Sequence, residues 1–306
     1  MPKRIAIQGV KGCFHEQAAR LFYKDLPDIE IIECDNFEDL YLAMDSGKAD
    51  AAIMAIENTV SGGLLPNFEL LRKYQREIKG EIFLRIKQNL MALPGQSIGD
   101  IKEVRTHYMA INQTREFFRD FPQIRLVESE DTAKSAAQVA REGLKGVGAV
   151  ASELAAELYG LDIIAESIET FKQNFTRFLI LDENYSPSES AIDKSSICFT
   201  LPHTSGSLAH VLTILSFYGM NLTRIQSLPI PGREWQYFFY ADIKFVDRER
   251  YSQALAAVRP LMEDLRILGE YVSAKGTAEE DIPKIYDICN CYIENGQRRI
   301  YIERFI

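Results

Sequence analysis

Short apolar runs recur along residues 4–181, each followed by a polar or glycine-containing turn and then by a segment with helical spacing. This alternation is typical of α/β units. The apolar runs predict strands at 4–8, 29–33, 51–56, 82–93, 104–106, 125–127, 147–150 and 178–181. The periodic segments predict helices at 16–23, 37–46, 64–74, 110–121 and 132–142. Asp35 or Asn36, and Asp131 or Thr132, are placed to cap two of these helices.

The pattern changes after a first domain that we assign to residues 1–182. Residues 183–194 are polar, rich in serine and interrupted by Pro187, as is typical of a linker. Residues 195–273 then read strand, helix, strand, strand, helix, strand, the order of the split ferredoxin-like βαββαβ motif. In the extension at 274–306 we expect an amphipathic helix near 282–294 and an alternating strand at 299–305.

Composition narrows the classes of function. The 306 residues carry 35 Lys+Arg against 44 Asp+Glu, a formal charge of −9, so no basic face for nucleic acid is expected. No apolar run approaches the roughly 20 residues that a membrane helix needs. The opening Met1–Arg4 lacks a secretory pattern, and we therefore expect a cytoplasmic protein.

Cysteines and histidines give no sign of a metal or a disulfide framework. The five cysteines are scattered without a C-x-x-C spacing, and the four histidines include no H-E-x-x-H pair. We predict reduced thiols, no metal and no cofactor.

In α/β folds ligands bind where strand carboxyl ends meet helix N-termini, so the turns after the strands are the candidates for chemistry. The turn at 9–12 could face an anion, although a tight turn needs glycine in any case. The polar turn at 57–63 either caps the next helix or, through Glu57, donates a proton. The segment 129–132 predicts chiefly a helix cap, with no catalytic role.

Two further segments are candidates. His107 follows a predicted strand and precedes a helix that carries Gln113; it either satisfies a local backbone group or acts on a substrate. Arg177 stands between Phe175 and Phe178 at the start of an apolar strand. It could hold a carboxylate in a dry pocket or pair with a structural acid.

Taken together, these segments resemble prephenate dehydratase. The resemblance rests on GVKGCFHEQAA at 9–19, IENTVSGG at 56–63, THYMAINQT at 106–114, SELAAELYGLDIIAESI at 152–168 and NFTRFLIL at 174–181. The second module is similar to an ACT domain, through GSLAHVLTILSFYGMNLTRIQSLP at 206–229. Five motifs in the right order across the first domain make the resemblance specific.

The resemblance implies a catalytic domain of two lobes like a type II periplasmic binding protein, with the cleft between them. Lobe 1 would span about 1–79 and 168–182, and lobe 2 about 80–167, with crossings near 79–81 and 167–171. The reaction would convert prephenate to phenylpyruvate, CO₂ and water without a cofactor. The implied catalytic residues are Thr176, Glu57 and His107, and the implied substrate-binding residues are Gly12, Asn58, Thr59, Gln113, Arg177 and Phe178.

In this hypothesis Thr176 donates to the leaving hydroxyl, and Glu57 or His107 is the source of the proton. Arg177 and the turn amides near Gly12 and Asn58 would hold the pyruvyl carboxylate.

The ACT resemblance implies a homodimer or tetramer formed through these modules and L-phenylalanine as a possible allosteric inhibitor. The implied effector-binding residues are Gly206, Ser207, Leu208, Asn221, Leu222, Gln226 and Ser227. Where relatives carry Glu-Ser-Arg-Pro, this chain has Gln226-Ser227-Leu228-Pro229, and the loss of both charges predicts weaker inhibition by phenylalanine.

Two alternatives stay open at this stage. The chain could dehydrate arogenate, which carries an ammonium where prephenate has a keto group; a carboxylate placed to pair with that ammonium would favour it. The chain could instead be a non-catalytic ligand-sensing protein of the same fold.

Overall fold

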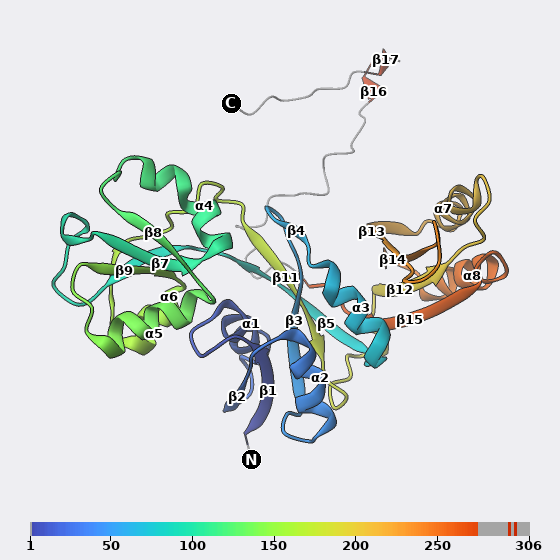
Figure 1. The fold of residues 1–306 in the computed structure, drawn as a ribbon. Helices are drawn as coiled ribbons and strands as arrows, with labels where there is room; N and C mark the ends of the chain where they lie inside the picture. Colours follow the sequence, from blue (N-terminus) through green and yellow to red (C-terminus); the bar gives the residue numbers. More distant parts are fainter. Residues whose placement is uncertain (1, 275–292, 295–296, 299–306) are drawn as a thin grey trace.

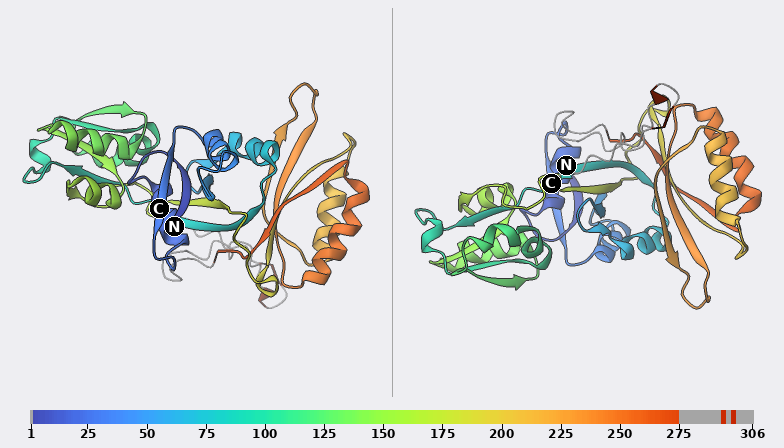
Figure 2. Two further views of the ribbon diagram at one scale, coloured as in Figure 1. Left: turned by 90° about the horizontal axis from the view of Figure 1, so that it is seen from below. Right: turned by 90° about the horizontal axis from the view of Figure 1, so that it is seen from above.

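The computed structural model describes residues 2–274, 293–294 and 297–298. Three α/β units lie in a row, with the first lobe in the middle, the second lobe on one side of it and the C-terminal module on the other (Figure 1). The two further views in Figure 2 give the same order.

The first lobe is built on a sheet of strand order β2-β1-β3-β11-β5, with β4 paired to the end of β3. Its strands are β1 (Lys3–Gln8), β2 (Ile29–Cys34), β3 (Ala51–Asn58), β4 (Gly62–Gly63), β5 (Ile78–Arg85) and β11 (Phe175–Leu181). Its helices are α1 (Phe14–Phe22), α2 (Phe37–Asp45) and α3 (Leu65–Tyr74). The alternation of side chains along a strand divides the core, because Ile5 and Ile7 join one apolar cluster and Ala6 joins another.

The second lobe has strand order β10-β6-β9-β7-β8. Its strands are β6 (Asn89–Ala92), β7 (Glu103–His107), β8 (Arg125–Ser129), β9 (Val147–Ala151) and β10 (Asp162–Ala165). Its helices are α4 (Tyr108–Arg119), α5 (Thr132–Glu142) and α6 (Glu153–Tyr159), with a short 3₁₀ turn, η1 (Ile98–Asp100). The bounds of α5 are those predicted, and Asp131 is its cap, accepting from the Lys134 amide at 2.8 Å. Likewise Asn36 caps α2.

The crossing between the lobes lies later than predicted. The apolar run 82–93 is not one strand: β5 stays in the first lobe, where it pairs antiparallel with β11, and β6 begins the second lobe. The chain therefore crosses at 86–88 rather than near 79–81, and it returns between β10 and β11. The prediction joined two apolar runs into one strand across the polar residues Arg85, Lys87, Gln88 and Asn89, which mark the break.

The C-terminal module has an antiparallel sheet of order β13-β14-β12-β15, the ferredoxin-like arrangement. Its strands are β12 (Lys194–Thr200), β13 (Asn221–Pro229), β14 (Tyr237–Lys244) and β15 (Asp264–Tyr271). Its helices are α7 (Ser207–Phe217) and α8 (Arg248–Val258), with 3₁₀ turns η2 (Glu189–Ala191) before the module and η3 (Arg259–Leu261) after α8. The predicted βαββαβ order is confirmed, and α8 ends at Val258, two residues before Pro260.

One face of this sheet is covered by α7 and α8, and the other packs on the first lobe. Cys198, Leu228, Tyr240 and Tyr271 share a core cluster with residues of α2, α3 and β3. Strands β15 and β5 approach so closely that a Cβ built on Gly269 would overlap the carbonyl oxygen of Ile78. The module is thus packed against the back of the first lobe.

Within the extension, the described residues form two short antiparallel strands, β16 (Ile293–Glu294) and β17 (Gln297–Arg298). Apart from 293–294, which are extended, the helix predicted near 282–294 and the strand predicted at 299–305 lie outside the described residues.

Candidate active site

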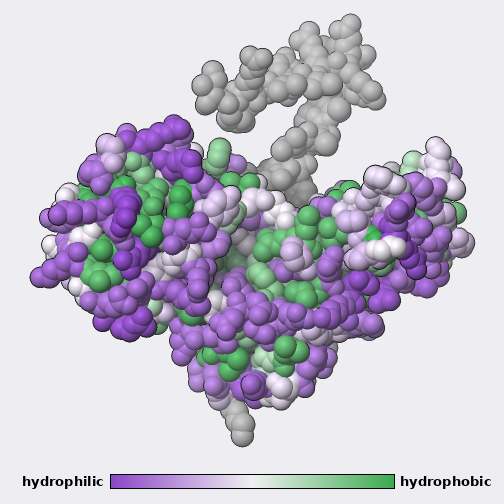
Figure 3. All heavy atoms as spheres, in the orientation of Figure 1, coloured by the Kyte–Doolittle hydropathy of each residue, from purple (hydrophilic) through white to green (hydrophobic). Residues whose placement is uncertain are grey.

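A cavity of about 430 Å³ lies between the two lobes, and both lobes contribute to its lining. The surface is hollowed there, with apolar side chains beside the hollow (Figure 3). The apolar part of the lining includes Phe14, Leu64, Ile86, Met109 and Phe178. A planar, partly apolar substrate would find both a dry wall and polar groups here.

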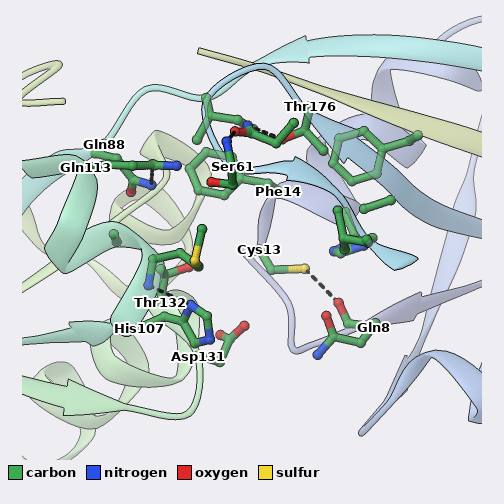
Figure 4. Close-up of a pocket in the computed structure, with 18 of the residues that line it drawn as sticks. Gln8, Cys13, Phe14, Ser61, Gln88, His107, Gln113, Asp131, Thr132 and Thr176 are labelled. Atoms are coloured by element: carbon green, nitrogen blue, oxygen red, sulfur yellow. Dashed lines mark hydrogen bonds between the residues drawn. The ribbon is translucent and has the colours of Figure 1, made fainter. Parts of the chain in front are cut away.

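Thr176 and Asn58 meet on the wall that the first lobe contributes. They are register partners on β11 and β3, and the Asn58 side-chain amide donates to the Thr176 hydroxyl oxygen at 2.9 Å (Figure 4). The Asn58 Oδ1 accepts from the amides of Val60 and Ser61, each at 2.9 Å, which fixes the orientation of the side-chain amide. The Thr176 oxygen accepts this hydrogen bond, and no described residue accepts the Thr176 proton, so the hydroxyl can donate into the cavity.

Gln113 connects the two lobes. Its Oε1 accepts from the side-chain amides of Gln88 and Asn174, each at 3.0 Å. Asn174 in turn accepts from the Asn58 amide at 2.7 Å. Hydrogen bonds between side-chain amides therefore connect α4 to Thr176. A movement of one lobe relative to the other would change these hydrogen bonds.

His107 is the N-cap of α4, and its Nδ1 accepts from the Met109 amide at 3.2 Å. This bond requires an unprotonated Nδ1, so in the neutral ring the proton is on Nε2. The ring lies beside Asp131 in the cavity (Figure 4). His107 can therefore present a proton donor to a bound molecule.

Two carboxylates also line the cavity, Glu130 and Asp131. Asp131 uses one oxygen to cap α5, while the other lies 3.2 Å from where a Cβ on Gly9 would be, at the start of the first lobe. Burial raises the pKa of Asp131. Among the described residues that line the cavity there is no Lys or Arg. We interpreted Asp131 only as a cap, although its position indicates the site: it follows β8, the parallel neighbour of the strand that ends at His107.

His15 lines the cavity between two aromatic rings, with centroids 5.5 Å from Phe37 and 4.9 Å from Phe178. Its Nε2 is buried without a hydrogen-bond partner among the described residues. Burial lowers the pKa of His15 to about 3, so the ring is neutral near pH 7.

Four of the residues expected at the substrate lie outside the cavity lining, and two of them are held by backbone contacts. The Gly12 amide donates to the Glu16 carboxylate at 2.6 Å, and a Cβ on Gly12 would lie 2.9 Å from the Cα of Ala155. Thr59 donates through its hydroxyl to the carbonyl of Gln173 at 2.9 Å. The expectation that Gly12 and Thr59 contact the substrate is therefore corrected: Gly12 allows close packing of the lobes, and Thr59 continues the pairing with β11.

The other two, Glu57 and Arg177, point to the opposite face of their strands. Thr176 and Phe178 face the cavity, and the alternation of a strand sends Arg177 to the other side. There Arg177 is 3% exposed and bonds to Glu57 at 3.0 Å and to Glu81 at 2.7 Å. The expectations that Arg177 holds a substrate carboxylate and that Glu57 supplies the proton are corrected accordingly.

The residues expected to bind an effector lie at the start of α7 and along β13. Gly206 is the N-cap of α7, with φ +85°, and the hydroxyls of Thr204 and Ser207 are 2.7 Å apart. Strand β13 is an edge strand, on which Gln226 donates to the carbonyl of Ser227 at 2.9 Å. Their binding role stays a prediction.

Metal-binding clusters and membrane-spanning helices are both absent from the part of the chain that the structure describes. It contains no group of three or more His, Cys, Asp or Glu side chains arranged to hold a metal. None of its helices has the length and apolar character to cross a membrane.

Comparison with known proteins identifies the family. The model of the family "Prephenate dehydratase" matches residues 5–186. A relative from Arabidopsis thaliana, named arogenate dehydratase/prephenate dehydratase 2, is 34% identical over 279 residues, 88% of this chain and 72% of its own length.

Two solved structures are also similar. One, named GqqA and described as a quorum-quenching acylase, superposes with a TM-score of 0.80 at 30% identity, over 89% of this chain and 98% of its own. The other, a prephenate dehydratase from Arthrobacter aurescens in complex with L-Phe, gives 0.77 at 29% identity, over 88% and 89%. Since the family model matches residues 5–186 and the Arabidopsis relative is 34% identical over 88% of the chain, this chain belongs to the prephenate dehydratase family of hydro-lyases.

Proposed function

We propose that the chain converts prephenate to phenylpyruvate, CO₂ and water. The observation that carries the proposal is the meeting of Thr176, Asn58, Gln113 and His107 at one cavity between the lobes. In this reaction the ring carboxylate leaves as CO₂, its bonding electron pair enters the ring, and the ring hydroxyl departs with one added proton as water. The protein must hold the substrate, protonate the leaving oxygen and keep water from the ring carboxylate.

From these contacts we infer a role in the reaction for each side chain. Thr176 donates a hydrogen bond to the leaving hydroxyl while Asn58 holds its oxygen in place. The one added proton comes from His107, which takes it up from solvent, passes it on through Nε2 and is neutral again afterwards. Phe14 and Phe178 form a dry wall for the ring. The N-terminus of α1 lies at the cavity, where Cys13 and Phe14 line it, and its positive end favours the pyruvyl carboxylate.

A second candidate is the same reaction on arogenate. The cavity contains Glu130 and Asp131 and, within the described lining, no Lys or Arg. Prephenate brings two negative charges to this site, whereas arogenate brings an ammonium that Asp131 would pair with. The raised pKa of Asp131 reflects burial, which a bound cation would offset.

We further propose that the C-terminal module is an ACT regulatory domain that binds an amino acid at Gly206–Leu208 and along β13, and that copies of the chain associate through it. Its ferredoxin-like topology supports this, as does the relative whose structure is in complex with L-Phe. We place the protein in the cytoplasm.

The test is turnover of each substrate by the purified full-length chain in metal-free buffer, with phenylpyruvate or phenylalanine measured as product. Asp131→Asn is compared with the wild type on both substrates. We expect prephenate turnover, and a selective loss with arogenate in the variant would assign Asp131 to the ammonium. If neither substrate turns over while both stabilise the fold, the chain is a sensor.

A further inference from the structure

We propose that Arg177 and Glu57 are positioning residues, held by side chains of the C-terminal module so that their strand neighbours Thr176 and Asn58 keep the geometry the reaction needs. The inference rests on the proposed function and deepens it. It makes the C-terminal module a structural part of the catalytic site, independent of whether that module binds an effector.

The first contact is a pair of interactions with Arg177, made by Asp242 and Tyr271, which we call the clasp. Its guanidinium bonds to Asp242 of β14 and donates to the Tyr271 hydroxyl of β15 at 2.9 Å. Ser196 of β12 bonds to both Asp242 and Tyr271, the latter at 2.7 Å. Two strands of the module therefore contact one side chain of β11, and a third strand supports both contacts through Ser196. Tyr271 is fully buried.

The second contact is the pair of cations around Glu57 and Glu81. Arg224 of β13 bonds to Glu57, and Lys194 of β12 bonds to Glu81 at 2.9 Å. The cluster formed by Glu57, Glu81, Arg177, Lys194, Arg224 and Asp242 thus contains three cations and three anions. Although burial acts to raise it, the pKa of Asp242 is held below its ordinary value by Arg177 and Lys194.

The cluster lies directly behind the cavity wall. Arg177 is covalently adjacent to Thr176, and Glu57 to Asn58, whose mutual hydrogen bond is 2.9 Å long. A small displacement of a catalytic group costs a large factor in rate, because the reacting atoms must be held close to their final geometry. Loss of a buried ion-pair partner leaves an unpaired charge, which the strand accommodates by moving.

The test compares Asp242→Asn, which keeps shape and removes the charge, with Arg248→Gln, which breaks the exposed Arg248–Glu270 pair of the same module. We expect kcat of the Asp242 variant to fall by roughly 10- to 100-fold with little change in KM. The Arg248 control should keep both. Hydrogen exchange of peptides covering 56–63 and 174–178 should rise in the Asp242 variant alone.

The proposal is overturned if folded Asp242→Asn keeps its kcat and its exchange, or if only KM changes. If that variant does not fold, Tyr271→Phe removes one hydroxyl from the clasp on Arg177 and is judged by the same criteria, with a smaller expected loss of kcat. If the wild type dehydrates neither prephenate nor arogenate, the proposed function fails, and hydrogen exchange alone decides whether the module holds the two strands.

Discussion

The two faces of strands β3 and β11 carry different kinds of side chain. The face toward the cavity carries neutral groups, an amide and a hydroxyl, and one of its protons is left free. The face toward the C-terminal module carries charges that are buried and paired on several sides. Adjacent residues of a strand point to opposite faces, and here the two faces have different roles. The residues on the cavity face contact a ligand, and the residues on the charged face hold the two strands in place.

The largest effect should come from the charged face. Arg177→Met leaves Glu57, Glu81 and Asp242 without their shared cation, and we expect the free energy of unfolding to fall by about 3–5 kcal/mol. Urea denaturation followed by circular dichroism measures this. Arg177→Lys keeps one positive charge and should lose less unfolding free energy. Equal stability of the Met variant and the wild type would mean that the charged face does not hold the strands.

On the cavity face the expected loss is in rate. His107→Asn keeps an acceptor for the Met109 amide at the start of α4 but removes the group that delivers a proton. We expect kcat to fall by about 100-fold or more, with a change in unfolding free energy below about 1 kcal/mol. His203→Asn, at an exposed histidine of the C-terminal module, is the matched control. A normal kcat in His107→Asn would move the proton source elsewhere.

Contact between module and lobe can be weakened without touching a charge. Gly269→Ala places a methyl group against the carbonyl of Ile78, and overpacking of this kind costs about 1–3 kcal/mol. In the control Gly99→Ala the nearest atom lies 3.7 Å from the added carbon, so the free energy of unfolding should change little. Thermal unfolding of the two variants gives the result; an unperturbed Gly269→Ala would mean that β15 and β5 are not tightly packed.

The last effect is seen only in acid solution. The pKa of His15 is lowered to about 3 by burial, so below about pH 6.5 the unfolded chain binds a proton that the folded chain does not. Stability should therefore fall as the pH drops from about 6.5 to about 3, by up to about 1.4 kcal/mol per pH unit. The difference between wild type and His15→Leu isolates this contribution. Parallel pH profiles would refute it.

Hydrophobic periodicity was sufficient to predict most of the strands and helices and the βαββαβ module, because each depends on local pattern. It failed at the crossing between the lobes, where two apolar runs were read as one strand although Arg85, Lys87, Gln88 and Asn89 interrupt them. It also missed the short β10 and α6, whose few residues carry little periodic signal.

For the site, motif and order predicted five of the residues that line the cavity, but side-chain direction was misjudged. Thr176 and Arg177 are adjacent, so the two-residue period of a strand already implied that only one of them faces the substrate. The partners of Arg177 could not be predicted in the same way. Asp242 and Tyr271 are 65 and 94 residues away in sequence, and only packing of the module on the first lobe brings them there.

In the proposed mechanism Thr176 donates a hydrogen bond to the hydroxyl that leaves the ring. The most direct measurement is the steady-state rate of phenylpyruvate formation from prephenate by the wild type, Thr176→Ala and Thr176→Ser. The account predicts that kcat falls by about 10²–10³-fold in the alanine variant with KM nearly unchanged, and that serine restores most of it. An alanine variant with normal kcat and a raised KM would contradict the account and make Thr176 a binding group only.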